Sequence, residues 1–279
     1  ALQTTGLLDR LLAGGFRYAF VSNADNLGAL LHMGILAHVA VHRIPFLMEV
    51  TARTESDRKG GHLARARETG RLLLRESAQC PADETADFQN VEKYDLFNTN
   101  NLWLDLEALR DMLRACDGLP ELPLIVNRKT VDPVRGDSPA VVQLEAAMGA
   151  AISCFENAAA LVVPRFRFAP VKTTNDLLAI RSDLYTLGEE HQVALHPLRF
   201  TPPPDIVLDP RFYKNIADFE RRFAKGAPSL LQCDSLKIDG DIHFGANVRI
   251  EGAVHLRNPT DLPARIADGT RLHTPVRPV

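Results

Sequence analysis

Cysteine is scarce in this 279-residue chain, and its four cysteines lie far apart: Cys80, Cys116, Cys154 and Cys233. None belongs to a C-x-x-C pair, which argues against a zinc knuckle or a dithiol redox motif. Scattered thiols without partners are typical of a compartment that keeps cysteine reduced. The sequence therefore predicts structural cysteines and a cytoplasmic location.

An excess of positive charge is also missing. The chain has 32 Lys and Arg against 35 Asp and Glu, a net charge of −3. Neutralising many backbone phosphates requires a basic excess, so general nucleic-acid binding is disfavoured. The longest mainly apolar stretch, residues 27–41, is interrupted by His32 and His38 and is too short to cross a bilayer. We expect neither a nucleic-acid partner nor a membrane span.

Several catalytic motifs are absent as well. The nine histidines show no H-E-x-x-H spacing, and no G-x-S-x-G elbow supports a serine nucleophile. What the chain does have is an ordinary globular composition, with 46% apolar and 24% charged residues. This composition disfavours disorder, collagen and coiled coil.

Short apolar runs alternate with helical stripes through the first two thirds of the chain. The runs predict strands at residues 18–23, 45–51, 71–78, 94–98, 122–127 and 160–163. Apolar residues spaced three or four apart predict helices near residues 27–35, 106–113, 144–155 and 177–187. Such alternation indicates an α/β fold, with a mainly parallel, mixed sheet flanked by helices.

The pattern changes after Pro197. Residues 197–228, which include three consecutive prolines, suggest a linker with one short helix at 217–223. Beyond it, apolar residues recur every six positions in two registers, with small residues in a third: Leu236, Ile242, Val248 and Val254; Ile238, Phe244, Ile250 and Leu256; Gly240, Ala246 and Gly252. Ile266 and Leu272 are again six apart.

A six-residue period suits a β-solenoid, in which each short strand forms one wall of a coil. Two hairpins with period-two alternation remain the alternative, because six is a multiple of two. The sequence thus predicts two domains, residues 1–228 and residues 229–279.

Polar clusters follow several of the predicted strands. The segment 22–28 places Asn23 and Asp25 at a strand-to-loop junction, where α/β proteins commonly bind ligands. Asp25 could hold Mg²⁺ through an oxygen, and Asn23 could hydrogen-bond a sugar or a phosphate. A turn that caps the next helix is the alternative.

Two further clusters suit the recognition of hydroxyl groups. Glu49 lies near the end of the predicted strand 45–51, and the later pair Gly60 and Gly61 permits close backbone approach to a ligand or forms a plain turn. Asn98, Asn100 and Asn101 sit together at a predicted strand end, and each amide offers both a donor and an acceptor. N-capping of the following helix by Asn or Asp105 would explain one of these amides but not all three.

A lysine precedes a predicted capped helix near the end of the α/β region. Lys172 stands before Thr173 and Asp176, so a cation and a helix N-terminus together could stabilise a transferring phosphoryl group. A solvated lysine beside a cap is the alternative.

Taken in order, these clusters resemble the UTP–glucose-1-phosphate uridylyltransferase family, also called UDP-glucose pyrophosphorylase. The similarity extends nearly from end to end and rests on these segments: residues 20–29, 48–51, 59–61, 97–103, 143–145, 163–165, 167–168 and 171–174. The six-residue period also fits, because this family ends in a left-handed β-helix that mediates oligomerisation in some members. The resemblance therefore implies a Rossmann-like nucleotidyltransferase sheet, a C-terminal left-handed β-helix and a homo-oligomer formed through it.

The resemblance also implies residue roles. Asp25 corresponds to the Mg²⁺ ligand, Asn23 and Asn100 to contacts with the sugar phosphate, and Lys172 to the lysine that steadies the phosphates. Glu49, Gly60 and Gly61 would line the sugar pocket. The implied substrates are UTP and glucose-1-phosphate, and the implied products are UDP-glucose and pyrophosphate.

One departure affects the expected activity. Family members begin with a glycine-rich nucleotide loop, a lysine shortly after it and a Gly-His-Gly-Asp segment, and none of these is found here. Gly14 and Gly15 lack the flanking pattern of that loop. The chain therefore resembles the C-terminal part of such an enzyme, and its activity as it stands is left open.

Three alternatives remain. The same fold and reaction could act on N-acetylglucosamine-1-phosphate, although Asn100 in its motif favours glucose. The chain could bind a sugar phosphate or serve in assembly without turnover. A hexapeptide-repeat acyltransferase with His243 or His255 as its catalytic group is disfavoured, because about three coils are too few.

Overall fold

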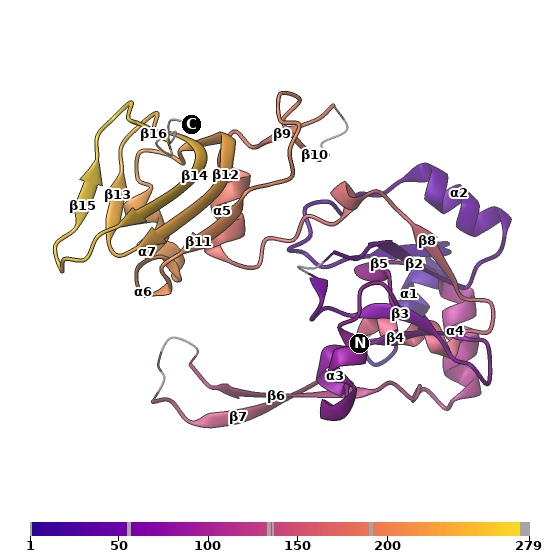
Figure 1. Ribbon diagram of the computed structural model, residues 1–279. Helices are drawn as coiled ribbons and strands as arrows, with labels where there is room; N and C mark the ends of the chain where they lie inside the picture. The colour runs from indigo at the N-terminus through magenta and orange to yellow at the C-terminus, as the bar shows by residue number, and fades with distance from the viewer. Residues whose placement is uncertain (1, 55–56, 133–134, 136, 190–191, 274–279) are drawn as a thin grey trace. The chain divides into compact units, whose positions relative to one another are not determined.

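The computed structural model describes residues 2–54, 57–132, 135, 137–189 and 192–273, which form two compact units (Figure 1). Unit 1 comprises Ala1–Ala24 and Ala29–Phe168, and unit 2 comprises Asp25–Gly28 and Ala169–Val279. The four-residue segment Asp25–Gly28 therefore belongs by its contacts to the later part of the chain. No helix in the described ranges is both long and apolar enough to cross a bilayer.

Unit 1 is built on a six-stranded mixed sheet. Its order is β4-β3-β5-β2-β8, and β1 also pairs with β5. The strands are β1 (Tyr18–Val21), β2 (Phe46–Ala52), β3 (His62–Arg65), β4 (Leu72–Arg75), β5 (Leu96–Asp105) and β8 (Ala159–Val162).

Fewer strand pairs in this sheet are parallel than the alternation of predicted strands and helices led us to expect. Among the described strands, β2 and β8 pair in parallel, and the other pairs are antiparallel. A short turn containing Gly70, with φ of 68°, joins β3 to β4, and short turns can join only antiparallel neighbours. The long strand β5 is antiparallel to all three of its partners.

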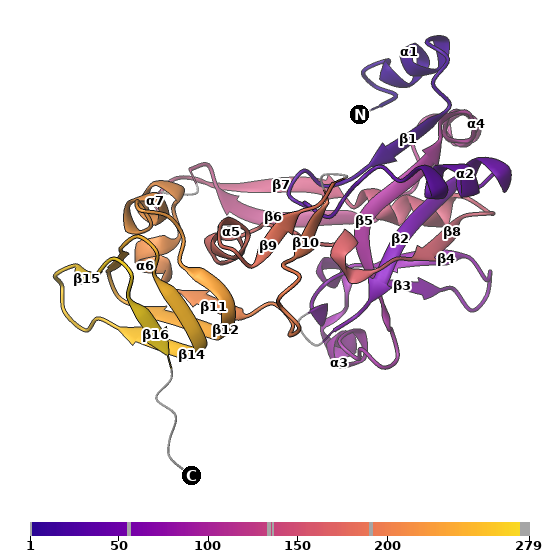
Figure 2. The same ribbon diagram turned by 90° about the horizontal axis from the view of Figure 1, so that it is seen from above.

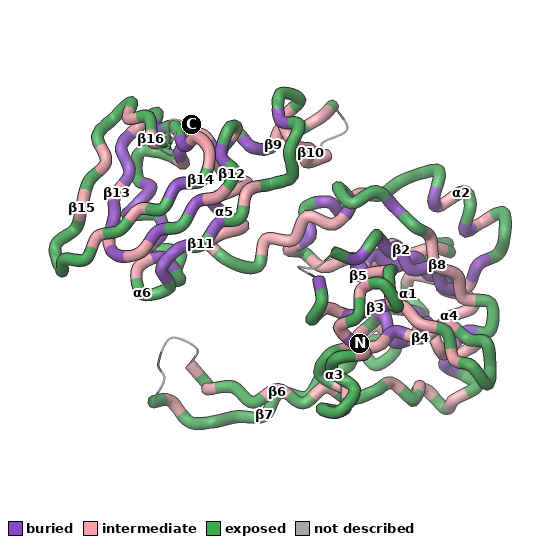
Figure 3. The backbone as a smooth tube through the Cα atoms, viewed as in Figure 1, coloured by how far each residue is buried: buried purple, intermediate pink, exposed green. Residues whose placement is uncertain are grey.

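Both faces of the sheet are covered, which explains why β2 is apolar along most of its length. Phe46, Met48 and Val50 pack with α4 (Leu106–Ala115) and the 3₁₀ segment η4 (Met148–Cys154). Leu47 and Trp103 pack with α2 (Met33–Val41) on the opposite face. Within unit 1, the buried residues accordingly concentrate in β2 and β5, where the tube is purple in Figure 3.

Smaller elements complete unit 1. Helix α1 (Leu7–Ala13) packs against α4 through Leu8, Leu106 and Leu113. The remaining short helices lie in connections: η2 (Ser77–Gln79), η3 (Ala82–Glu84), α3 (Thr85–Phe88) and η5 (Arg165–Arg167). Helix α4 begins where predicted, with Asp105 Oδ1 accepting from the Glu107 and Ala108 amides at 2.9 and 3.2 Å.

Two predicted helices differ from the structure. The first, near residues 27–35, begins only at Met33, as α2, and Asn26 and Leu27 instead pair in extended form with residues 169–170. Residues 144–155 form the end of strand β7 (Ala140–Ala146) followed by η4. Val141 and Val142 lie in β7, and β-branched residues favour a strand over a helix.

Strand β7 pairs antiparallel with β6 (Leu124–Thr130), so residues 122–127 do not return to the main sheet as predicted. The two strands form a ribbon that projects from the sheet of unit 1 (Figure 1). Its apolar side chains are largely exposed, with Leu124, Val126, Val142 and Leu144 each more than half accessible.

Unit 2 combines three short helices, two parallel sheets and one antiparallel strand pair around a single core. Its helices are α5 (Thr174–Arg181), α6 (Pro210–Tyr213) and α7 (Ile216–Arg222). Figure 2 shows the sheet β11-β12-β14-β16 beside α6 and α7. The strands are β9 (Tyr185–Leu187), β10 (Val193–Leu195), β11 (Asp205–Leu208), β12 (Ser229–Asp239), β13 (Ile242–Phe244), β14 (Arg249–Arg257), β15 (Ala264–Ile266) and β16 (Arg271–His273).

The six-residue period is confirmed as coils of parallel strands. Leu236 in β12 lies beside Val254 in β14, eighteen residues or three periods later. Ile250 lies beside Leu272 in β16, twenty-two residues later, because residues between β14 and β15 lengthen the last coil. Strands β13 and β15 form a second parallel wall. Parallel pairing rules out the two hairpins that the period alone allowed.

The compact units do not follow the predicted boundary between residues 228 and 229. Strand β11 lies parallel to β12, and Tyr213, Phe219 and Phe223 are buried in the same core as the coils. The proline-rich stretch is therefore part of unit 2 rather than a linker, since its apolar side chains close one side of that core.

Candidate active site

In unit 1, the polar cluster lies where β5 changes neighbours. β5 pairs with β3 at Phe97 and with β1 from Leu102 onward, which leaves a gap on one edge between them. Asn98, Asn100 and Asn101 occupy this gap inside the strand, not at its end as predicted.

Asn100 adopts a left-handed backbone conformation, with φ of 60°, which asparagine tolerates better than most residues. The Oδ1 of Asn98 accepts from the Asn100 amide at 2.9 Å, and this bond fixes the turn. The Nδ2 of Asn100 then donates to Oδ1 of Asn23 at 3.0 Å. The structure therefore brings together Asn23 and Asn100, the two residues predicted to contact the sugar phosphate.

Glu49 lies in the same unit but is fully buried. Its carboxylate accepts two bonds of 2.7 Å from the Arg167 guanidinium, one from Trp103 Nε1 at 2.9 Å and one from Asn101 Nδ2 at 3.1 Å. Glu49 was predicted to line the sugar pocket. Its side chain has no exposed surface and both carboxylate oxygens accept hydrogen bonds, so it is not available to a ligand. It instead holds the strands that carry the asparagines.

The paired glycines are explained by neighbouring side chains. A Cβ at Gly60 would overlap the Phe97 ring, and a Cβ at Gly61 would lie 2.5 Å from Glu76 Oε1. The side chains of Phe97 and Glu76 thus occupy the space that a side chain at either glycine would need. Their predicted contact with a sugar stays a prediction.

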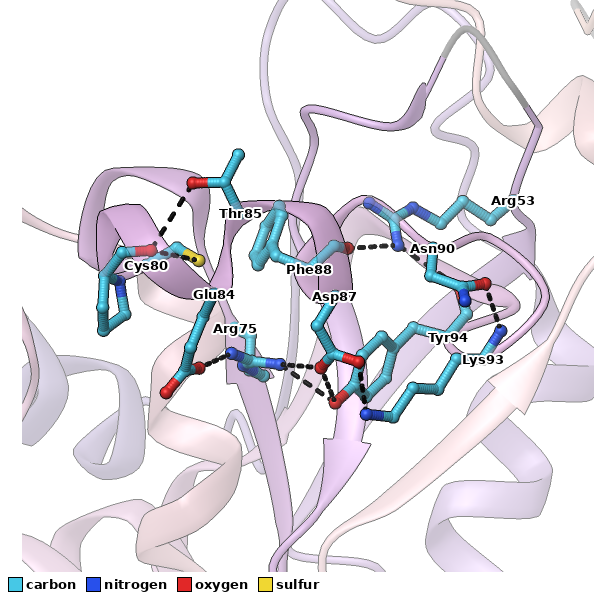
Figure 4. A network of polar contacts seen from close by, with 11 residues as sticks. Arg53, Arg75, Cys80, Glu84, Thr85, Asp87, Phe88, Asn90, Lys93 and Tyr94 are labelled. Carbon is cyan, nitrogen blue, oxygen red and sulfur yellow. Dashed lines mark hydrogen bonds and ion pairs between the residues drawn. The ribbon is translucent and has the colours of Figure 1, made fainter.

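Two arginines fix the loop that leads to these glycines. Arg165 makes two bonds to Asp57, at 2.8 and 3.0 Å. Burial opposes ionisation of Asp57, but bonds from Arg165 and Thr54 outweigh it and lower its pKa. The buried Arg53 donates to backbone carbonyls, among them Phe88 at 3.0 Å (Figure 4).

In unit 2, two segments far apart in the sequence lie side by side. The Val171 amide donates to the Asp25 carbonyl at 2.9 Å, and the Leu27 amide donates to the Ala169 carbonyl at 3.1 Å. This pairing sets the predicted metal ligand Asp25 next to the segment that ends in Lys172.

Lys172 directly precedes the N-cap of α5, as predicted. Thr173 and Asp176 form a capping box, and the Lys172 amide also donates to Asp176 Oδ2 at 3.0 Å. The lysine is exposed, and its ammonium forms no ion pair with any residue that the structure describes. A cation that is not neutralised by a carboxylate remains available to an anionic ligand.

The chemistry of Asp25 suits a hard cation. Its Oδ1 is buried and has no hydrogen-bond partner within the described part of the chain. The described residues contain no group of three or more His, Cys, Asp and Glu that could enclose a metal. A single carboxylate oxygen fits Mg²⁺, which keeps several waters and is commonly bound through one or two carboxylates together with substrate phosphates.

The sequence analysis gave no role to two residues that hold these groups in place: Asn26 in unit 2 and Arg167 in unit 1. Both lie within the motifs. One signal was available for Arg167, since a lone glutamate inside a buried strand needs a cationic partner. Nothing local reveals the role of Asn26, because its partner Ala169 is distant in the sequence.

Comparison with known proteins identifies the family of this chain. A family model described as "UTP--glucose-1-phosphate uridylyltransferase" matches residues 1–251. The UTP–glucose-1-phosphate uridylyltransferase of Solanum tuberosum is 44% identical over 96% of this chain and 54% of its own length. The chain thus spans about half the length of the curated relatives it matches.

Solved structures are similar as well. A UDP-glucose phosphorylase from Trypanosoma brucei is 48% identical with a TM-score of 0.87, covering 98% of this chain and 58% of that one. A Leishmania major UDP-glucose pyrophosphorylase mutant in complex with UDP-glucose is 45% identical with a TM-score of 0.84, covering 98% of this chain and 59% of that one.

Proposed function

Because this chain belongs to the UTP–glucose-1-phosphate uridylyltransferase family, we propose that it carries the sugar-phosphate and catalytic-lysine part of a uridylyltransferase site. In the proposed reaction, a phosphate oxygen of glucose-1-phosphate bonds to the α-phosphorus of UTP. The bond from that phosphorus to the bridging oxygen of the β-phosphate breaks. UDP-glucose forms, and pyrophosphate leaves with the bonding electrons.

The observation that carries this proposal is the pairing of segment 25–28 with residues 169–171 in unit 2. Through it the backbone of Asp25 bonds to Val171, the residue before the exposed Lys172, and Oδ1 of Asp25 has no hydrogen-bond partner among the described residues. Both groups suit a phosphate chain, the lysine directly and the aspartate through a cation. Lys172 would stabilise negative charge that develops on the phosphates, without a covalent enzyme intermediate.

Mg²⁺ is the proposed cofactor, and Asp25 is the residue that would hold it. When bound, the ion supplies charge neutralisation of the phosphates. The orphaned Oδ1 of Asp25 supports this assignment, because a buried carboxylate oxygen without a donor is costly unless a ligand satisfies it.

The sugar phosphate is proposed to bind at the Asn23–Asn100 pair in unit 1. Side-chain amides can both donate to phosphate oxygens and accept from hydroxyls. Asn98 and the buried Glu49–Arg167 pair would hold this pair in place. Gly60 and Gly61 are proposed to form the adjacent wall of the sugar pocket.

Three wider features belong to the same proposal. The parallel coils of unit 2 are proposed to be a left-handed β-helix through which copies of the protein assemble, supported by the eighteen-residue repeat. A cytoplasmic location is supported by the free state of all four cysteines. UTP and glucose-1-phosphate are the proposed small-molecule partners.

The test is pyrophosphate release by the 279-residue chain with UTP and Mg²⁺, given either glucose-1-phosphate or N-acetylglucosamine-1-phosphate. We expect release with glucose-1-phosphate and much slower release with the N-acetyl sugar. The opposite preference would reassign the sugar. Binding of UDP-glucose to the folded chain without release from either sugar would reduce the function to ligand binding.

A further inference from the structure

We propose that Asn26 is a positioning residue that holds Asp25 beside Lys172. This inference rests on the proposed function. Asn26 touches no reacting group in the proposed mechanism and acts through the two segments that it joins.

The side chain of Asn26 bonds to both segments at once. Asn26 is only 5% exposed, and its Oδ1 accepts from the Gly28 amide at 3.1 Å and from the Ala169 amide at 2.8 Å. An amide oxygen has two lone pairs, so one atom can satisfy both donors. One bond closes the turn after Asp25, and the other bond anchors it to the segment that leads to Lys172.

The backbone alone provides a short bridge. Asn26 faces Pro170 in an isolated antiparallel pair, flanked by the Leu27–Ala169 and Val171–Asp25 bonds. Pro170 has no N–H, and no regular strand extends the pairing on either side. The Asn26 side chain therefore adds a third link between the segments, and it is the link that a substitution can remove.

The consequence concerns the proposed metal ligand directly. Asp25 precedes Asn26, and its carbonyl accepts from the residue before Lys172. Loss of the Asn26 oxygen would free the Gly28 and Ala169 amides and let the Asp25 turn separate from the lysine segment. Phosphates held through both groups would then bind more weakly, because the two contacts would no longer be fixed together.

The variants are Asn26→Leu, which removes the acceptor at similar size, and Asn26→Asp, which keeps it. Asn258→Leu is the matched control. Asn258 also lies in unit 2 and bonds the backbone of neighbouring segments through its amide, with 2.8 Å to the Asp241 and Leu262 carbonyls. It lies outside the proposed phosphate site.

Two measurements are made on the full chain. Hydrogen exchange of peptides spanning residues 25–28 and 169–172 reports the bridge itself without any ligand. Calorimetric titration with inorganic pyrophosphate and Mg²⁺ reports the proposed phosphate site, and a denaturation curve confirms folding. Asn26→Ala replaces Asn26→Leu if the leucine variant does not fold.

We expect Asn26→Leu to speed exchange in both peptides and to weaken magnesium pyrophosphate binding by about tenfold. Asn26→Asp should restore both properties, and Asn258→Leu should change neither. Unchanged exchange, unchanged affinity or failure of the aspartate to restore them would overturn the positioning role. If the unsubstituted chain binds no magnesium pyrophosphate, the proposed function fails first, and that result is visible before any variant is made.

Discussion

Acidification should destabilise unit 1 through one histidine. His62 in β3 is fully buried, and neither ring nitrogen has a hydrogen-bond partner in the described part of the chain. Its ring stacks on Tyr94 at 4.2 Å and lies 4.5 Å from Phe88. Burial, together with the charges of Arg53 and Arg75, lowers the pKa of His62 to about 4.

The sign of the effect follows from where the proton binds. In the unfolded chain, histidine titrates near its ordinary pKa of about 6.5, so acid protonates the unfolded state before the folded one. The free energy of unfolding is unaffected well above pH 6.5 and falls between pH 6.5 and about 4. From this pKa difference, His62 removes ~2 kcal/mol at pH 5 and ~3 kcal/mol once both states are protonated.

The assay is urea denaturation at a series of pH values, followed by tryptophan fluorescence. Trp103 is the only tryptophan in the sequence, and it is buried in the sheet of unit 1, so its signal reports the unit that contains His62. Comparison with His62→Phe isolates the histidine, because other titrating groups are shared. His42→Phe, at an exposed histidine of the same unit, is the control.

We expect the stability difference between His62→Phe and the unsubstituted chain to grow by ~2 kcal/mol from pH 7.5 to pH 5. The growth is the informative quantity, because a constant offset from repacking the larger ring would cancel. His42→Phe should follow the unsubstituted chain. A pH-independent difference for His62→Phe would refute the reasoning and show that the histidine is solvated or bonded when folded.

Three further results are expected. Glu49→Gln should leave the Arg167 charge buried without its carboxylate and lower the free energy of unfolding by about 3–5 kcal/mol, measured by urea denaturation with circular dichroism. Gly60→Ala should cost about 1–3 kcal/mol, and Phe97→Leu in the same chain should recover part of it in a double-mutant cycle. Cys233, whose thiol pKa burial raises to about 11, should resist a thiol reagent under native conditions until urea unfolds unit 2, as followed by mass spectrometry.

The repeating pattern of unit 2 could be predicted because each hexad position faces one environment. Leu236, Ile242 and Val248 are all buried, as six-residue spacing requires when successive walls enclose one core. Strand β2 was equally predictable from a continuous apolar run. In both cases the burial of each residue follows from its local pattern.

The failed elements depend on partners distant in the chain. Leu27, Leu31 and Ile35 have helical spacing, yet only Ile35 lies in α2 and is buried. Leu27 is exposed and extended, because residues 26–27 pair with residues 169–170. Spacing also could not show that the proline-rich stretch contributes Tyr213 and Phe219 to the core of unit 2.

In the site, too, some residues follow from local sequence patterns and others depend on distant partners. Strand ends and a helix cap located Asn23, Asp25 and Lys172 from local patterns. The fold decides whether a carboxylate binds a ligand or pairs with an arginine. Glu49 is buried and pairs with Arg167. The resemblance identified the motifs, but the positioning bonds of Asn26 and Asn98 required coordinates.

The most direct test of the central claim is the dependence of pyrophosphate release on Lys172. The 279-residue chain is given UTP, glucose-1-phosphate and Mg²⁺, and Lys172→Ala is compared with Lys214→Ala, at an exposed lysine elsewhere in unit 2. The account predicts release by the unsubstituted chain, loss of about 100-fold or more in Lys172→Ala and no change in Lys214→Ala. Equal rates for Lys172→Ala and the unsubstituted chain would contradict it.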